Sequence, residues 1–187
     1  YAPAAREQAF LPLPHFSGKA YQLGKAFPDP KLGYVQLTRM GGHPGRETAV
    51  VVRWRSPIDG VVRIQGRLIH ESSKGDGVRA RTIHQGNVVT SWQARASEVA
   101  TPLPPRKVQR GDVIDFVVDC GPAGSSNSDS YQWNQIVRVV KSDTPHYEAG
   151  YQWNARTGFA GPAQPKLERW DLIAQAILVS NEFFFVD

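Results

Sequence analysis

Cysteine is nearly missing from this 187-residue chain, because Cys120 is the only one. A lone thiol cannot form an internal disulfide, and it provides none of the paired spacings that zinc and haem sites use. The five histidines are scattered through the sequence, with no HExxH motif and no pair at metal-binding spacing. The sequence therefore predicts no metal centre that depends on histidine or cysteine ligands.

Long apolar stretches are missing as well. A membrane-spanning helix needs about 20 consecutive apolar residues. The most apolar region of this chain, residues 172–187, is interrupted by Gln175, Ser180 and Glu182. We therefore expect no membrane span.

The motifs of common enzyme classes are not found either. Ser125, Ser126, Ser128 and Ser130 cluster without the G-x-S-x-G elbow of hydrolases, and no histidine adjoins Cys120 in the sequence. The glycines of GKAF and GDGV lack the spacing that places a phosphate at a helix N-terminus. These absences lead us to expect a protein that is not an enzyme.

Aspartates are the remaining candidates for chemistry in the middle of the chain. Two carboxylates held at the right separation hydrolyse glycosidic bonds, and clustered oxygen ligands bind calcium. Aspartate next to glycine, however, is the ordinary chemistry of turns. We therefore expect no cofactor in this chain, with a structural calcium ion as the alternative. The aspartates concerned are Asp76, Asp112, Asp115, Asp119 and Asp129.

Positive charge is in excess. The chain has 22 basic and 17 acidic residues, a net charge of +5, and 15 of the basic residues are arginine. A guanidinium group binds carboxylate, sulfate or phosphate through two parallel hydrogen bonds, but arginines on strands also pair with Asp and Glu across a sheet. Both interpretations stay open. Because the basic residues are spread among acids over many segments, the charge does not indicate nucleic acid as a partner.

Short runs of alternating apolar and polar residues dominate the chain from residue 32 to 140. In residues 60–70, Val62, Ile64 and Leu68 share one side and Arg63, Gln65 and Arg67 the other, as expected for a half-buried strand. Repeated strands of this kind predict a mostly β protein, an antiparallel β-sandwich of the jelly-roll type. The predicted strand runs are 32–40, 48–56, 60–70, 76–86, 87–96, 112–120 and 131–140.

The regions at both ends differ from this pattern. Residues 1–31 are rich in proline and are predicted to form an extended N-terminal approach segment. We expect residues 32–187 to form a single sandwich domain that includes a long loop at 141–165. Leu167, Trp170, Ile173 and Ile177 recur at helical spacing, which predicts a C-terminal helix at about 166–180.

The tetrapeptide YQWN occurs twice, at 131–134 and 151–154, and draws attention to the aromatic residues. Sugar rings pack on aromatic side chains while their hydroxyls bond to amides and arginines, so this mixture suits a carbohydrate ligand. We expect aromatic rings to stack on sugars, Asn134 and Asn154 to bind hydroxyls, and Arg79 and Arg81 to favour acidic or sulfated chains. The rings concerned are Trp92, Tyr131, Tyr151 and Trp153.

Two linked signatures carry a family resemblance: W-x-x-P-x-D-G at 54–60 and G-D-G-V at 75–78. Together with most of residues 32–140 and the tail at 169–187, they resemble the carbohydrate-binding-like sandwich module and C-terminal tail of large planctomycete multidomain proteins with c-type cytochrome domains. The resemblance implies an extracytoplasmic, non-catalytic module of a longer protein, with polysaccharide and the other domains of the parent as partners. The CxxCH sequence is absent, so no haem is expected here. The alternative is a structural or docking domain that packs against those other domains.

Overall fold

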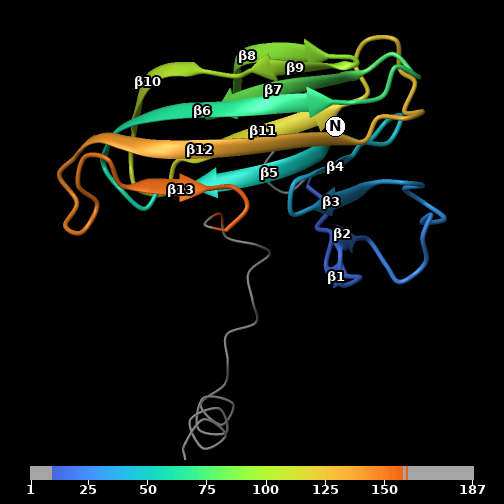
Figure 1. The fold of residues 1–187 in the computed structure, drawn as a ribbon. Coiled ribbons are helices and arrows are strands. Elements are labelled where there is room, and N and C mark those ends of the chain that lie inside the picture. The colour runs from blue at the N-terminus through green and yellow to red at the C-terminus, as the bar shows by residue number, and fades with distance from the viewer. Residues whose placement is uncertain (1–9, 158, 160–187) are drawn as a thin grey trace, which may run out of the picture.

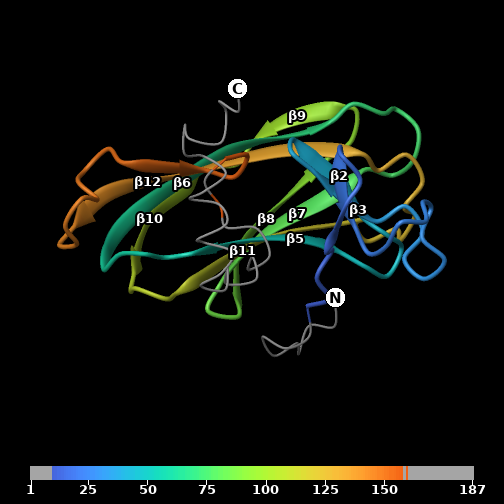
Figure 2. The ribbon, with the colours of Figure 1, turned by 90° about the horizontal axis from the view of Figure 1, so that it is seen from below.

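The computed structural model describes residues 10–157 and 159, and this part of the chain is built from β-strands and connecting loops, without helices. Every paired strand runs antiparallel to its neighbour. The strands form two sheets that pack face to face (Figure 1; Figure 2 shows the layers from below). This confirms the predicted mostly β, antiparallel two-sheet class. Within the described residues, no helix has the length and hydrophobicity needed to cross a membrane.

The larger sheet has nine strands, and its long central pair consists of β6 (Gly60–His70) and β12 (Tyr131–Ser142). The order is β1-β2-β3-β4-β12-β6-β10, while β13 adds to β12 and β9 adds to β6. The remaining strands are β1 (His15–Phe16), β2 (Ala20–Gln22), β3 (Gln36–Thr38), β4 (Gly41–His43), β9 (Ser97–Ala100), β10 (Leu103–Val108) and β13 (Gln152–Asn154).

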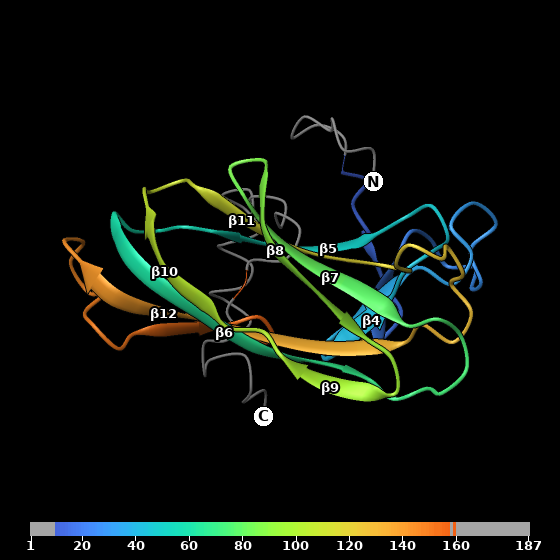
Figure 3. The same ribbon diagram turned by 90° about the horizontal axis from the view of Figure 1, so that it is seen from above.

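The smaller sheet has four strands in the order β5-β11-β7-β8. Its members are β5 (Val50–Arg55), β11 (Val113–Asp119), β7 (Val78–His84) and β8 (Asn87–Ala94). Figure 3 views the two sheets edge-on, with the layer of β5, β7, β8 and β11 beside the layer of β6, β10 and β12. The core cluster lies between the inner faces of these layers.

Side chains of alternate residues fill the space between the sheets. Val62, Ile64 and Leu68 of β6 are at most 2% exposed and share one core cluster with Ile114 and Phe116 of β11. The ring of Phe116 meets the Trp133 indole edge-on, with 5.7 Å between ring centroids. Because successive strand residues point to opposite faces, the side chains between these core residues point outward. The alternation predicted for residues 60–70 is therefore confirmed.

The structure adds strands that the sequence pattern did not indicate. Part of the expected approach segment, residues 15–22, forms β1 and β2, which extend the larger sheet through β3. Residues 152–154 lie in the expected loop 141–165, yet they pair with β12 as β13. Pairing with an available strand edge gives these short segments their structure, and no local periodicity is required. The predicted helix at 166–180, Trp170 and residues 160–165 lie outside the described residues.

Candidate functional site

The outer face of the larger sheet presents polar side chains in rows that cross three strands. Ile136 of β12 pairs with Asn154 of β13 on one side and with Gln65 of β6 on the other. In the next row, Arg138 pairs with Gln152 and with Arg63. Directly paired residues point to the same face, and neighbouring strands lie about 4.8 Å apart. Amide and guanidinium groups therefore form a continuous grid on this face.

Two further rows extend this grid along the strands. Asn134 pairs with Arg67 at one end, and Val61 pairs with Lys141 of β12 and Lys107 of β10 at the other. We call the whole surface the cationic face. Its polar residues are Arg63, Gln65, Arg67, Lys107, Asn134, Arg138, Lys141, Gln152 and Asn154.

Most cations of this face have no acidic partner. Arg63, Lys107 and Lys141 are exposed and form no ion pair with any residue in the described part of the chain. Arg138 donates a hydrogen bond to the neutral Gln152 Oε1, at 3.0 Å. Arg67 is the exception, because it pairs with Glu98. The face therefore keeps an excess of positive charge that is available to an anionic ligand.

An aromatic cluster borders this face where β13 meets β5. The Trp153 ring lies 5.3 Å from Trp54, 5.4 Å from Tyr147 and 5.0 Å from Tyr151, measured between centroids. Trp153 pairs with the inward-facing Val137, so its indole covers the buried Trp54. Tyr151 is 46% exposed. We call these four residues the edge cluster. Tyr151 is its most exposed ring, because Tyr147 and Trp153 are half-buried and Trp54 is buried.

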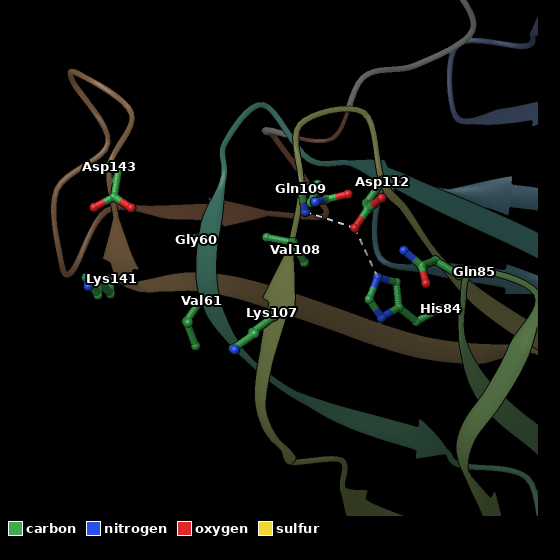
Figure 4. Close-up of a pocket in the computed structure, with 10 residues that line it drawn as sticks. All are labelled: Gly60, Val61, His84, Gln85, Lys107, Val108, Gln109, Asp112, Lys141 and Asp143. Carbon is green, nitrogen blue, oxygen red and sulfur yellow. Dashed lines mark hydrogen bonds and ion pairs between the residues drawn. The ribbon is translucent and has the colours of Figure 1, made fainter.

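A shallow pocket of about 500 Å³ lies at one end of the two sheets. Lys107, Lys141 and Asp143 line it together with a His84–Asp112 pair, whose Nε2 and Oδ2 atoms are 3.6 Å apart. Figure 4 shows His84 and Asp112 on one side of β10, with Lys141 and Asp143 beyond β6 on the other. A hydrogen bond from the Gln109 backbone amide is the main reason that the pKa of Asp112 is lowered. The pocket is thus lined by charges of both signs and continues the cationic face.

The predicted site residues do not form one site. Trp92 packs edge-on against Trp133, with 6.1 Å between centroids, and joins the core. Tyr131 is 6% exposed, and burial raises the pKa of its phenol. Both rings are therefore used in packing between the sheets. Tyr131 presents no face on which a sugar could stack, and Trp92 is half-buried.

The two predicted arginines lie on the opposite side of the molecule. Arg79 and Arg81 project from β7 on the outer face of the smaller sheet, where Asp119 accepts hydrogen bonds from both, at 3.1 and 2.6 Å. The structure does bring Asn134 and Asn154 together on the cationic face, and it places Tyr151 and Trp153 together in the edge cluster.

Several residues of the cationic face were not among the predicted site residues. Arg63, Gln65 and Arg67 carry a readable signal, because the alternation of β6 places them opposite its core residues. Arg138 carries the same signal, because alternation within residues 131–140 places it opposite Val137 and Val139. Gln152 carries none, since its position depends on the pairing of β13 with β12. Comparisons of the chain with protein-family models, with curated proteins and with solved structures find no match.

Proposed function

We propose that this chain is a non-catalytic carbohydrate-binding module, a jelly-roll-type sandwich within a larger extracytoplasmic, cytochrome-containing protein. Its ligand is an acidic or sulfated polysaccharide. The observation that carries the proposal is the grid of amides and cations on the cationic face, where Arg63, Lys107, Arg138 and Lys141 have no acidic partner among the described residues. Guanidinium groups bind carboxylate and sulfate in a bidentate manner, while amides donate to and accept from sugar hydroxyls.

The shape of the cationic face favours an extended ligand. Residues two apart on a strand are about 7 Å apart, so the rows from Asn134 to Lys141 follow one another along β12. A small molecule would contact one or two rows, whereas a polymer with regularly spaced anionic groups would contact all of them. Repeated weak contacts along one chain add up to useful affinity.

The edge cluster gives the proposed site one stacking position. Tyr151 precedes Gln152 of the cationic face, and its exposed ring lies at the edge of the sheet on the same side of β13 as Trp153, where contacts with Tyr147 and Trp153 hold it in place. A polymer on the cationic face would reach this ring by passing over the β13 edge. A ring fixed before binding loses little conformational entropy when a sugar packs on it. In this proposal Tyr151 contacts the ligand, and Trp153 acts as its support.

Affinity gel electrophoresis tests the proposal. We expect gels containing a sulfated polysaccharide to retard the protein, and a neutral polysaccharide to retard it less. Higher salt should weaken the retardation, because ions screen exposed charges over about 10 Å at 0.1 M. The double variant R63A/R138A should bind about tenfold more weakly, since each lost charge contact contributes up to about 1 kcal/mol.

The matched control is R39A/R156A, which removes the same charge from exposed arginines outside the cationic face. It should leave the retardation unchanged. Equal loss in both double variants would show that net charge alone attracts the polymer. Absence of retardation in every acidic gel at low salt would refute the proposal.

A docking function is the second candidate, and it rests on the segment from β1 to β4, including the connection between β2 and β3. Phe16, Phe27 and Tyr34 are 55%, 42% and 59% exposed there. Phe27 and Tyr34 meet edge-on, with 5.6 Å between centroids. Exposed aromatic groups of this kind are typical of protein contact surfaces. An F27S/Y34S variant would lose binding to a neighbouring domain of the parent and keep its retardation by acidic polysaccharide.

A further inference from the structure

Two aspartates lie in neighbouring loops at the end of the sandwich where β6 ends and β12 begins. Asp76 belongs to the loop 71–77 between β6 and β7, and Asp129 belongs to the loop 120–130 that precedes β12. Asp129 is fully buried, and neither of its carboxylate oxygens has a hydrogen-bond partner among the described residues. Oδ1 of Asp76 is also buried without a partner. Three carboxylate oxygens are therefore withdrawn from water and unsatisfied, an arrangement that normally costs several kcal/mol.

The nearest basic side chain does not satisfy these oxygens. His70 Nε2 lies 3.8 Å from Asp129 Oδ1, which is too long for a hydrogen bond, and it bonds instead to the Ser128 carbonyl oxygen at 3.0 Å. The other ring nitrogen, Nδ1, accepts from the Ala96 amide at 3.4 Å. Both ring nitrogens of His70 are thus bonded to the backbone, and neither makes a hydrogen bond to Asp129.

Two arginines hydrogen-bond to backbone carbonyl oxygens of the two loops and not to the aspartates. Arg95 donates to the carbonyl oxygens of Gly75 and Ser73, and Arg46 donates to the Gly124 carbonyl. Within residues 10–157 and 159, no lysine or arginine forms an ion pair with Asp76 or Asp129. Burial first, and the charge of Asp76 second, raise the pKa of Asp129 to about 7. Among the described residues, neither carboxylate therefore has a lysine or arginine counter-ion.

The backbone brings carbonyl oxygens to the same place. Gly75 has a φ of +79°, and a side chain there would overlap the Asn127 carbonyl oxygen and lie 3.5 Å from Asp129 Oδ1. Only glycine allows loop 120–130 to approach loop 71–77 so closely. The Asn127 carbonyl and the Asp129 carboxylate consequently lie against the same backbone position, next to Asp76.

We propose that Asp76 and Asp129 bind a calcium ion that joins loops 71–77 and 120–130. Calcium takes six to eight oxygen ligands in flexible geometry and readily uses backbone carbonyls, whereas magnesium requires a near-ideal octahedron and keeps several waters. Among the described residues, no three His, Cys, Asp or Glu side chains converge on one point. The two carboxylates therefore supply the charge, and loop carbonyls such as that of Asn127, together with water, complete the ligand set.

Calcium titration of the protein after EDTA treatment and dialysis tests this proposal. Isothermal titration calorimetry should give about one ion per chain. At calcium concentrations about a hundredfold above the dissociation constant, the melting temperature should rise by roughly 5–10 °C. Magnesium at the same concentration should have a much smaller effect. The absence of both heat and stabilisation with calcium would overturn the proposal.

Charge-neutralising variants locate the ion. Asp76→Asn and Asp129→Asn should each abolish the calcium-dependent rise, whereas Glu148→Gln removes an exposed carboxylate elsewhere and should keep it. In EDTA at about pH 8, D129N should be at least as stable as the unmodified protein, because it removes a buried, uncompensated charge. If D129N does not fold, D76N alone decides the matter. A calcium response that persists in D76N would place the ion elsewhere and refute the site.

Discussion

The two outer faces of the sandwich both carry arginines, but they use them differently. On the smaller sheet the central strand β11 supplies Asp115 and Asp119, and each accepts hydrogen bonds from arginine on a neighbouring strand. On the larger sheet, the central strands β6 and β12 carry no acidic residue. The arginines of one face are thus paired with aspartates of the same sheet, whereas those of the other face, apart from Arg67, remain available to a ligand.

The smaller sheet shows how complete this pairing is. Arg53 binds Asp115 through two hydrogen bonds, of 2.6 and 2.9 Å, while its guanidinium lies 4.8 Å from the centre of the Phe10 ring. Arg79 and Arg81 share Asp119. Arginine in a strand therefore has no fixed role, and the residues on the paired strand decide whether it supports the fold or binds a partner.

The largest effect should come from breaking the Arg53–Asp115 pair. Asp115 is 6% exposed, so Asp115→Ala leaves a partly buried guanidinium without its carboxylate. We expect a loss of about 3 kcal/mol in the free energy of unfolding, measured with urea, because removal of one partner of a buried pair is strongly destabilising. The matched change on the other face, Arg63→Ala, should cost less than about 0.5 kcal/mol. Equal losses would show that the two faces do not differ in the way described.

A smaller loss of stability is expected when Asp119 is replaced, but this replacement should also change ligand binding. Asp119→Asn should cost about 1 kcal/mol, because the ion pairs of its partly exposed carboxylate are partly screened by solvent. It also frees Arg79 and Arg81. We therefore expect D119N to be retarded more strongly than the unmodified protein in gels with sulfated polysaccharide. Unchanged retardation would mean that unpaired arginines on a strand are not sufficient for binding.

The two copies of YQWN show how much local sequence predicts. In the first copy, Tyr131 and Trp133 point inward and Gln132 and Asn134 outward, as alternation within residues 131–140 predicts. The second copy has no alternating continuation, and nothing local indicates a strand. It takes the same orientation because β13 pairs with β12, which places Trp153 beside Val137 and Asn154 beside Ile136. Alternation thus predicts the face of a side chain only where a strand is already evident.

Local sequence could not predict which side chains on neighbouring strands bind each other. Arg53 and Asp115 are 62 residues apart, and their contact requires β5 and β11 to be neighbours. The same limit applies to Arg79 and Arg81, which are outward residues, as their alternation indicates, but are bound to Asp119 on β11. Trp92 and Tyr131 show the same limit for aromatic residues, because an aromatic side chain in a strand can face either the core or solvent. Strand order, which arises from long-range pairing, decided each of these roles.

The smallest effect concerns Asp112 in the end pocket, where the two sheets meet. The folded-state pKa of this carboxyl lies below its unfolded value, chiefly because the Gln109 amide donates to it, at 2.9 Å. A lowered pKa means that the carboxylate contributes stability above the unfolded pKa of about 3.9 and loses this contribution as the pH falls through the folded value. Asp112→Asn should therefore cost about 0.5 kcal/mol near neutral pH. The difference should shrink below about pH 4.

Urea unfolding between neutral and acidic pH measures this difference, with Asp143→Asn in the same pocket as the control. A difference that stays constant over the whole pH range would show that the hydrogen bond from the Gln109 amide does not depend on the charge of Asp112.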